Sequence, residues 1–387
     1  MKVGLLTYHF SDNYGALFQA YALREWFHQR NIDAEFLNYH PSYVEEGGAL
    51  EKPWKIKLWR KNLTIMYMKF SHIQRTLMGN KAHKASFDDF RYHYLGVTKP
   101  RRKTVESLYE DVQDKNMLVC GSDQIWNPSI QKGLDPVYFL DIPGAEHIRK
   151  VAYAPSFGRT SIEDKYNKEL LGLISRIDAI SVRESTGLDI ISKAGSTNKE
   201  LHVVPDPTIL LGNFDKILKD NLPVENKVFC YALRTDEVIR EVAAIVGSHI
   251  EGGIVSPRST RQRWTDIGHG IAPGPVEWLR TLARSKVVVS NSFHGIALSI
   301  VLNRPFIAVS LPGKKSAMNA RAHNLLKIAG LTHRIVDHTD KDRIITLLDT
   351  PIDWKKVNIK LTEVRENAEV YLANQIELAQ QEVYERA

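Results

Sequence analysis

The chain has 387 residues, of which 43% are hydrophobic and 25% charged, a composition typical of soluble globular proteins. This length exceeds what one hydrophobic core usually serves, so we expect two domains. The net charge of +7 is modest, and the sequence lacks aromatic platforms and nucleic-acid-binding motifs. These features together exclude nucleic acid as an expected partner.

The cysteines and the apolar runs bear on the cellular compartment. Cys120 and Cys230 both lie in apolar, strand-like runs, and we interpret them as reduced core thiols. Without Cys or His pairs at ligand spacing, we expect no metal site. The first residues contain no apolar run of signal-peptide length, and no window reaches the roughly 18 uncharged apolar residues of a membrane span. We therefore expect a cytoplasmic protein.

Strand-like and helix-like stretches alternate along the first two hundred residues. We predict strands at 2–8, 34–40, 117–121, 150–158 and 178–184, and helices at 17–29 and 185–195. Such alternation indicates parallel strand pairing with right-handed crossovers. Three prolines, Pro205, Pro207 and Pro223, then interrupt the pattern, which places a junction near 205–225.

A second alternating unit follows this junction. We predict strands at 227–233, 252–256, 286–290, 306–311 and 333–337, and helices at 236–247, 275–285, 293–303, 319–330 and 342–349. One long helix over about 355–386 is expected to pack back on the first domain. The predicted fold is two facing, Rossmann-like, doubly wound α/β domains. Their predicted bounds are 1–210, with a basic helical insertion at about 50–103, then 211–355, then the C-terminal helix 356–387.

The insertion carries a concentrated positive charge. Between Lys52 and Lys103 there are fourteen Lys or Arg residues and two acidic residues. Five apolar residues recur within it at steps of three and four, namely Ile56, Trp59, Leu63, Met66 and Phe70. This spacing predicts one apolar stripe on a basic helix. The stripe either faces the protein core or rests on anionic lipid head groups or a lipid-diphosphate acceptor at the inner face of the membrane.

Polar and small residues follow the predicted strands. In open parallel sheets, ligands collect where the carboxyl ends of strands meet the loops that lead into helices. The loops concerned contain residues 11–15, 121–124, 155–159, 183–185, 206 and 290–295. The sequence contains no dinucleotide-binding glycine fingerprint, no Walker loop and no nucleophile elbow. The loops therefore predict an anion-binding cleft between two α/β domains.

Two residues of these loops have competing interpretations. Arg183 ends a strand and precedes a helix, where a guanidinium suits a carboxylate or phosphate. The alternative is an arginine at a helix end that pairs with Glu184. His294 begins a predicted helix, whose first N–H groups form half of an anion site. The alternative is a capping or core histidine that a backbone carbonyl satisfies.

Several stretches, in this order, resemble the polysaccharide pyruvyl transferase family from about residue 3 to about 335. They are DNYGALFQAYAL, VCGSDQIWNP, YAPSFG, SVRE, VPDPTILL and GPVEWLRTLARSKVVVSNSFHGIALSIVLNRPF. The resemblance implies a GT-B-like pair of Rossmann-type domains. It also implies transfer of the enolpyruvyl group of phosphoenolpyruvate to two hydroxyls of a sugar in a surface or capsular polysaccharide precursor. The products are a pyruvate ketal and phosphate, and phosphoenolpyruvate is a co-substrate beside which no cofactor is implied.

The resemblance also implies contacts to phosphoenolpyruvate. Arg183 and His294 match the family's contacts, and Phe293 and Ser292 stand beside His294. Some branches of the family carry arginine in an Arg-Leu-His arrangement where this chain has Ser292, so one fixed cation is missing here. Arg321 matches a later Asn-x-Arg pattern and is a candidate replacement.

Two lysines are an alternative source of the missing charge. Lys314 and Lys315 lie just upstream of Asn319, which begins the Asn-x-Arg pattern. Their other interpretation is an ordinary solvated loop. The phosphoenolpyruvate set is therefore predicted as Arg183, Ser292, Phe293, His294 and Arg321.

The chemistry requires both charge stabilisation and proton transfer. We predict that Arg183 clamps the anion and that His294 holds phosphate or acts as a general acid. Asp12, Asp123 and Asp206 are candidate bases on the acceptor side, and the predicted catalytic set is His294, Asp12 and Asp123. Predicted contacts to the acceptor sugar are Asn13, Tyr14, Gln124, Trp126 and Asp206.

Two other functions fit the same architecture. A nucleotide-sugar glycosyltransferase of GT-B type is the alternative enzyme. A non-catalytic anion-binding or glycan-binding relative is the third class, because the arginine of the Arg-Leu-His arrangement is absent. The acceptor is expected to be a sugar or a lipid-linked oligosaccharide, with peripheral membrane contact through the basic insertion.

Overall fold

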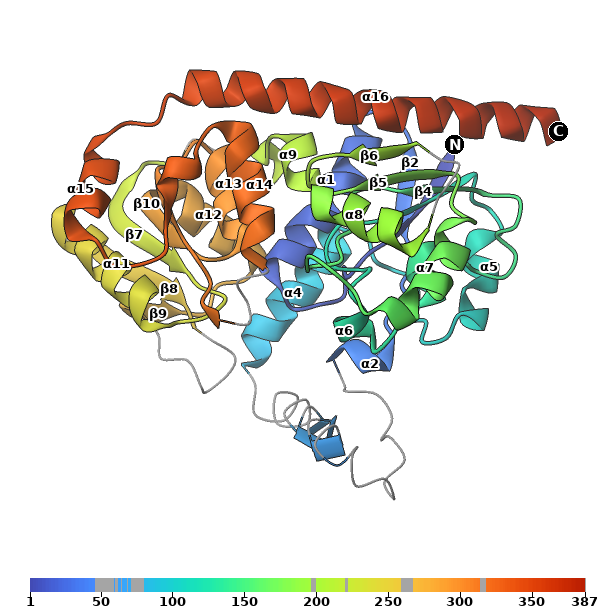
Figure 1. Cartoon of the computed structure of the whole chain (residues 1–387), viewed down its shortest axis with the longest axis horizontal. Coiled ribbons are helices and arrows are strands. Elements are labelled where there is room, and N and C mark those ends of the chain that lie inside the picture. Colours follow the sequence, from blue (N-terminus) through green and yellow to red (C-terminus); the bar gives the residue numbers. More distant parts are fainter. Residues whose placement is uncertain are drawn as a thin grey trace. The chain divides into compact units, whose positions relative to one another are not determined.

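The computed structural model describes residues 1–45, 80–195, 200–219, 222–258, 267–313 and 318–386, together with residues 59, 62, 63, 65–67, 69 and 70. The chain divides into two compact units (Figure 1). Unit 1 consists of Met1–Val203 and Leu372–Ala387, and unit 2 consists of Val204–Tyr371. Within the described residues, each unit has one six-stranded sheet surrounded by helices, which confirms the prediction of two α/β domains.

Unit 1 is built on a parallel sheet with the strand order β2-β1-β3-β4-β5-β6. The strands are β1 (Lys2–Leu6), β2 (Asp33–Phe36), β3 (Met117–Cys120), β4 (Arg149–Ala152), β5 (Ala179–Val182) and β6 (Leu201–Val203). The helices are α1 (Tyr14–His28), α2 (Ser42–Glu45), α4 (Lys81–His93), α5 (Tyr109–Val112), α6 (Pro128–Gln131), α7 (Asn167–Ile174) and α8 (Ser185–Ala194). Short 3₁₀ turns lie at Glu106–Leu108, Pro136–Phe139 and Asp164–Tyr166.

Unit 2 repeats this plan with the strand order β12-β11-β10-β7-β8-β9, again in parallel. The strands are β7 (Glu225–Tyr231), β8 (Gly253–Pro257), β9 (His269–Ile271), β10 (Ser285–Ser290), β11 (Phe306–Val309) and β12 (Ile335–Val336). The helices are α9 (Pro207–Leu211), α10 (Asp215–Leu218), α11 (Glu237–His249), α12 (Pro275–Arg284), α13 (Phe293–Val301), α14 (Asn319–Ala329) and α15 (Lys341–Asp349), with a 3₁₀ turn at Thr332–Arg334.

The order of the strands defines one switch point in each sheet. In unit 1 the chain adds β2 on one side of β1 and β3 on the other, so the order reverses between β1 and β3. In unit 2 the same reversal occurs between β7 and β10. At such a point the flanking crossovers lie on opposite faces of the sheet, and a crevice opens at the carboxyl ends of the two strands.

The strands at the centre of each sheet are buried, as expected for parallel sheets covered on both faces. Cys120 of β3 and Cys230 of β7 are both buried and free, so the prediction of core thiols is confirmed. Burial raises the pKa of the Cys230 thiol to about 12, which keeps it protonated at neutral pH.

The C-terminal helix α16 (Trp354–Arg386) is the long red helix of Figure 1. Its last part groups with unit 1, where the guanidinium of Arg149 donates to Gln375 Oε1 at 2.8 Å and pairs with Glu382 Oε1 at 2.5 Å. The prediction that this helix packs back on the first domain is therefore confirmed. The buried face of α16 includes Leu361 in unit 2 and Leu372 in unit 1.

The basic insertion lies largely outside the described residues, and so does Ile56 of the apolar stripe. The other four stripe residues are described, and 61% of Trp59, 56% of Leu63, 56% of Met66 and 66% of Phe70 is exposed. The interpretation of a core-facing stripe is therefore wrong for these four residues. Within the described part of the chain, no helix is long and apolar enough to cross a membrane.

Candidate functional site

Arg183 is the buried cation at the carboxyl end of the unit 1 sheet. It follows β5 directly and is only 4% exposed. Its Nε lies 3.4 Å from Glu184 Oε2, and its Nη1 donates to Ser122 Oγ, also at 3.4 Å. The pairing with Glu184 that we considered as an alternative is thus present, and the guanidinium also reaches the loop after β3.

Glu184 connects Arg183 to a third strand end. The Ser156 hydroxyl, after β4, donates to Glu184 Oε1 and accepts from the N–H of Gly158 at 2.9 Å. The loops after β3, β4 and β5 therefore converge on one buried group of Ser122, Ser156, Arg183 and Glu184. Of these, the sequence singled out Arg183 alone for a role, because hydroxyls in loops are too common to indicate a contact.

A glutamine bridges the switch point of unit 1. Gln19 of α1 is fully buried, and its amide donates to Thr7 Oγ1 at 2.8 Å after β1. Its Oε1 accepts from the N–H of Ser122 at 3.0 Å after β3. Gln19 was missed in the sequence, although an amide within the apolar helical run LFQAYAL was the available signal.

Asp123 is the one of the three predicted bases whose carboxylate accepts no hydrogen bond from the described residues. Its backbone has a φ of 68°, and its carbonyl accepts from the N–H of Ser156 at 2.8 Å. The side chain is half-buried. Asp123 thus has both a fixed backbone and an available carboxylate at the carboxyl end of β3.

The residues at the start of α1 have partners in α4 or in α1 itself. Exposed Asp12 pairs with Arg91 of α4 at 2.5 Å, and the hydroxyl of Tyr14 lies 3.3 Å from His83 Nε2. Asn13 caps α1 by accepting from the N–H of Ala16 at 3.2 Å. The predicted catalytic role of Asp12 and the predicted acceptor contacts of Asn13 and Tyr14 stay predictions, and α4 was not predicted as a partner of these residues.

Trp126 requires a correction, because it is fully buried. Its indole N–H donates to the carbonyl of Tyr138 at 2.9 Å, and its ring stacks on Phe139 with centroids 4.8 Å apart. No face of the indole is left for a sugar, so Trp126 is a core residue and leaves the acceptor set. The neighbouring Gln124 is half-buried, with its Oε1 accepting from Asn127 Nδ2 at 2.9 Å.

Unit 2 pairs two of the predicted site residues. Asp206 Oδ2 lies 3.5 Å from His294 Nε2, and the exposed fractions of the two side chains are 0% and 9%. Asp206 Oδ1 accepts from the N–H and the hydroxyl of Thr208 at 3.0 and 2.8 Å, which caps α9. A carboxylate with no exposure and these contacts is unsuited to bind a sugar or take its proton, so the acceptor role for Asp206 is corrected.

The polar run between β10 and α13 is satisfied within unit 2. Ser290 Oγ donates to the carbonyl of Tyr231 at 2.7 Å and accepts from the N–H of Ser292 at 3.1 Å. Asn291 spans the switch point, because its Oδ1 accepts from the N–H of Leu233 at 2.7 Å and its amide donates to the carbonyl of Arg234 at 2.8 Å. Gln19 and Asn291 thus each link the loops that follow the two strands at the switch point of their unit.

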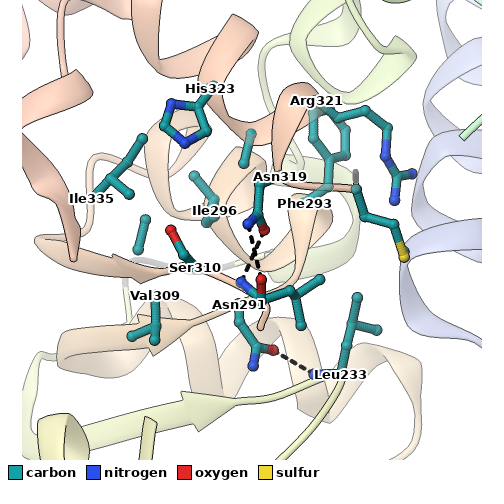
Figure 2. Close-up of a pocket in the computed structure, with 14 residues that line it drawn as sticks. Leu233, Asn291, Phe293, Ile296, Val309, Ser310, Asn319, Arg321, His323 and Ile335 are labelled. Atoms are coloured by element: carbon teal, nitrogen blue, oxygen red, sulfur yellow. Dashed lines mark hydrogen bonds between the residues drawn. The ribbon is translucent and has the colours of Figure 1, made fainter. Parts of the chain in front are cut away.

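A small pocket opens beside this run at the carboxyl ends of the unit 2 strands (Figure 2). Figure 2 shows the amide of Asn291 turned toward Leu233. The side-chain amide of Asn319 accepts from the N–H of Leu311 at 2.9 Å and donates to its carbonyl at 3.1 Å. Phe293 and Arg321 of the predicted phosphoenolpyruvate set also line it, with Arg321 Cζ 5.9 Å from the Phe293 ring centroid.

The predicted residues therefore fall into local groups within each unit. Arg183 lies with serine hydroxyls in unit 1, His294 lies with Asp206 in unit 2, and Phe293 lies with Arg321 at the pocket. Ser292 is buried at the position before α13, and its side chain makes no cap. Lys314 and Lys315 lie outside the described residues. Among the described residues, no group of three His, Cys, Asp or Glu side chains is placed to hold a metal ion.

Comparison with known proteins gives a family and distant structural likenesses. The family model described as polysaccharide pyruvyl transferase matches residues 13–311. No curated protein matches the chain. Among solved structures, a putative UDP-N-acetylglucosamine 2-epimerase from Listeria monocytogenes is 11% identical, covers 93% of this chain and 89% of its own, and has a TM-score of 0.45.

Two other solved structures are comparably distant. The S. aureus MnaA–UDP co-structure is 9% identical, covers 98% of this chain and 96% of its own, and has a TM-score of 0.46. The E. coli heptosyltransferase WaaC with ADP is 14% identical, covers 86% of this chain and 99% of its own, and has a TM-score of 0.36.

Proposed function

Because the chain belongs to the polysaccharide pyruvyl transferase family, we propose that it transfers the enolpyruvyl group of phosphoenolpyruvate to two hydroxyls of a sugar. The sugar is part of a precursor of a surface or capsular polysaccharide. The products are a cyclic pyruvate ketal and free phosphate. Phosphoenolpyruvate is a co-substrate, and the proposed reaction uses no cofactor.

The observation that carries this proposal is the position of Arg183 and His294. Arg183 is buried directly after β5, and His294 is buried in the first turn of α13, the helix that follows β10. Both lie near the carboxyl end of their sheet, where parallel sheets bind ligands. Phosphoenolpyruvate carries a carboxylate and a phosphate, and a buried guanidinium attracts such groups more strongly than an exposed one. A histidine beside a carboxylate supplies a group that holds or moves a proton.

The proposed reaction balances without a further reactant. One sugar hydroxyl gives up its proton and attacks the central carbon of phosphoenolpyruvate, while a proton is added to the methylene carbon, which becomes a methyl group. Phosphate then leaves with its bonding electron pair, and the second hydroxyl closes the ring and loses its proton. Arg183 stabilises the negative charge as it moves, and His294 holds phosphate or delivers the proton. Asp123, whose carboxylate is available, is the candidate base for the acceptor hydroxyl.

The test is turnover of phosphoenolpyruvate with a panel of free and lipid-linked glycosides. We expect phosphate release that depends on an acceptor, together with a ketal product identified by mass spectrometry and NMR. Release of a nucleoside diphosphate from a nucleotide sugar, with phosphoenolpyruvate left intact, would make the chain a glycosyltransferase. Binding of phosphoenolpyruvate or glycan without turnover of either would make it a binding protein.

Variants locate the reaction in the proposed site. Arg183→Ala and His294→Ala are each expected to lower the rate by about 10²–10³-fold, the usual cost of losing a group that stabilises developing charge. Arg176→Ala is the matched control, because Arg176 is 58% exposed at its side chain and pairs with Asp141 on the surface. Near-normal turnover in both site variants contradicts the assignment.

We also propose that the acceptor is reached at a membrane surface. Trp59, Leu63, Met66 and Phe70 are each more than half exposed, within a block that carries fourteen cationic and two acidic residues. Apolar and aromatic side chains surrounded by Lys and Arg suit the interface of an anionic bilayer, where apolar burial and charge attraction add.

Vesicle binding tests this contact. We expect the protein to sediment with phosphatidylglycerol vesicles and to dissociate from them as the salt concentration is raised. We expect no binding to phosphatidylcholine vesicles. A double variant, Trp59→Ser with Phe70→Ser, should lose most of this binding. Tyr384→Ser removes an aromatic residue elsewhere that is even more exposed, at 86%, and should not change this binding. Binding that is unaffected by the double variant contradicts the role of the stripe.

A further inference from the structure

The contacts of Asp206 fix how its carboxylate is oriented toward His294. One carboxylate oxygen of Asp206 accepts both hydrogen bonds from Thr208, and the other faces the imidazole of His294 at 3.5 Å. The carboxylate therefore has a fixed rotation, with Oδ2 directed at the ring. A distance of 3.5 Å is that of an ion pair and slightly longer than an ordinary hydrogen bond.

The backbone around Asp206 adds to this rigidity. Asp206 stands between Pro205 and Pro207, and a following proline restricts the preceding residue to extended conformations. Its φ of −54° and ψ of 145° agree with that restriction. The helix that follows, α9, packs on α13, the helix that carries His294. The orientation of Asp206 is consequently set before any substrate binds.

We propose that Asp206 is a positioning residue for His294. It holds the imidazole in the form with the proton on Nε2, so that Nδ1 is left to face the substrate, and it balances the positive charge when the ring takes a second proton. This inference rests on the proposed function for its catalytic consequence. A buried imidazolium without a counter-charge is costly, which gives the pair a physical reason to stay together.

The test uses Asp206→Asn, because asparagine is also a good helix cap and keeps the interaction with α9. Removing the charge and the fixed acceptor should lower kcat by on the order of 10²-fold or more, with the KM for phosphoenolpyruvate changed far less. Asp340→Asn is the matched control. Asp340 caps α15 in the same unit through the N–H of Arg343 at 3.0 Å, and this variant should retain full activity.

A double-mutant cycle separates positioning from a general structural effect. If Asp206 acts through His294, then Asp206→Asn combined with His294→Ala should be no slower than His294→Ala alone. A merely structural role predicts that the two losses multiply. Multiplying losses, or Asp206→Asn with turnover within about twofold of the wild type, overturns the proposal.

A second measurement does not depend on turnover. In ¹H–¹⁵N spectra of the imidazole, neutral His294 should carry its proton on Nε2 in the wild type and lose this preference in Asp206→Asn. If the wild type shows this form but transfers no pyruvyl group, the proposed function fails while the pairing holds. A proton on Nδ1 in the wild type overturns the pairing itself.

Discussion

Three aspartates with the same side chain have three different surroundings in this protein. Asp12 is exposed and pairs with Arg91, Asp123 is half-buried with an available carboxylate, and Asp206 is fully buried against His294. An exposed ion pair contributes little to stability, because water solvates both of its charges. A buried carboxylate with fixed contacts orients its neighbour instead. Surroundings therefore distinguish the candidate base, Asp123, from the candidate positioning residue, Asp206.

Burial also sets the protonation of His9, which follows β1 in unit 1. The side chain is almost fully buried, and this burial lowers its pKa to about 4 in spite of the contacts to Asn38 and Thr7, which raise it. In the unfolded chain the pKa is about 6.5. Between these two values the unfolded state binds the proton and the folded state does not. The contribution of His9 to the free energy of unfolding is therefore complete above pH 6.5 and is lost as the pH falls toward 4.

From this shift we predict the pH dependence of unfolding. Lowering the pH from 7 to 5 should reduce the free energy of unfolding by about 2 kcal/mol through His9. His9→Gln should flatten this part of the slope, because glutamine does not titrate. Urea unfolding of both proteins at pH 7, 6 and 5 gives the two slopes. Equal slopes contradict the assignment to His9.

At the scale of elements, the start of α13 depends on one glycine. A Cβ at Gly295 would lie 2.3 Å from Ser290 Oγ and 3.0 Å from the Tyr231 ring. The Ser290 hydroxyl has little freedom to move, because it bridges the carbonyl of Tyr231 and the N–H of Ser292. Glycine at 295 therefore lets the first turn of the helix approach β10 and β7 closely.

We accordingly predict opposite effects for two Gly→Ala changes in helices. Gly295→Ala should destabilise the protein by about 1–3 kcal/mol through overpacking. Gly172→Ala in α7 should stabilise it by up to about 1 kcal/mol, because a Cβ there meets no atom within 4 Å and alanine favours the helix. Thermal unfolding of the two variants checks this. A melting temperature for Gly295→Ala at or above that of the wild type contradicts the close approach.

The helices and strands were largely predictable from sequence because their patterns are local. Continuous apolar runs marked the buried strands, and the apolar period of 3.6 marked the helices, including α16. The partners of side chains were not predictable in this way. Trp126 bonds to Tyr138, 12 positions away, and Gln19 bonds to Ser122, 103 positions away. The local sequence pattern does not indicate either partner.

The site shows the same division between local and long-range information. The strand-end loops were located correctly because strand-to-helix transitions are visible in the sequence. The ranking of Asp12, Asp123 and Asp206 depended on contacts with Arg91 and His294, which come from other elements. The apolar stripe had the right spacing for a helix, yet spacing alone does not say whether a face is covered, and Trp59 and Phe70 are exposed.

At the scale of the whole molecule, both units connect the two strand ends at their switch point by the same kind of contact. Each places a buried amide across its switch point, Gln19 between β1 and β3, and Asn291 between β7 and β10. These amides satisfy backbone and side-chain groups that the crevice would otherwise leave unpaired. In each unit these hydrogen bonds tie the loops after two neighbouring strands to one another, and the proposed function needs such fixed loops to orient its substrate.

The helix α16 contributes to both units, and its buried face is therefore the place where a local change has a molecule-wide effect. Leu372 is fully buried, whereas Leu378 on the same helix is 39% exposed. We predict that Leu372→Ala costs about 2–5 kcal/mol, through lost apolar burial and the cavity it leaves. Leu378→Ala should change stability by less than about 0.5 kcal/mol.

Both leucines lie in the segment that groups with unit 1, so the loss of stability in Leu372→Ala should appear first in unit 1. Faster hydrogen exchange of the β1 and β3 amides than in the wild type measures this loss, and Leu378→Ala is the control. Equal exchange rates in the two variants would show that the end of α16 adds nothing to the stability of unit 1.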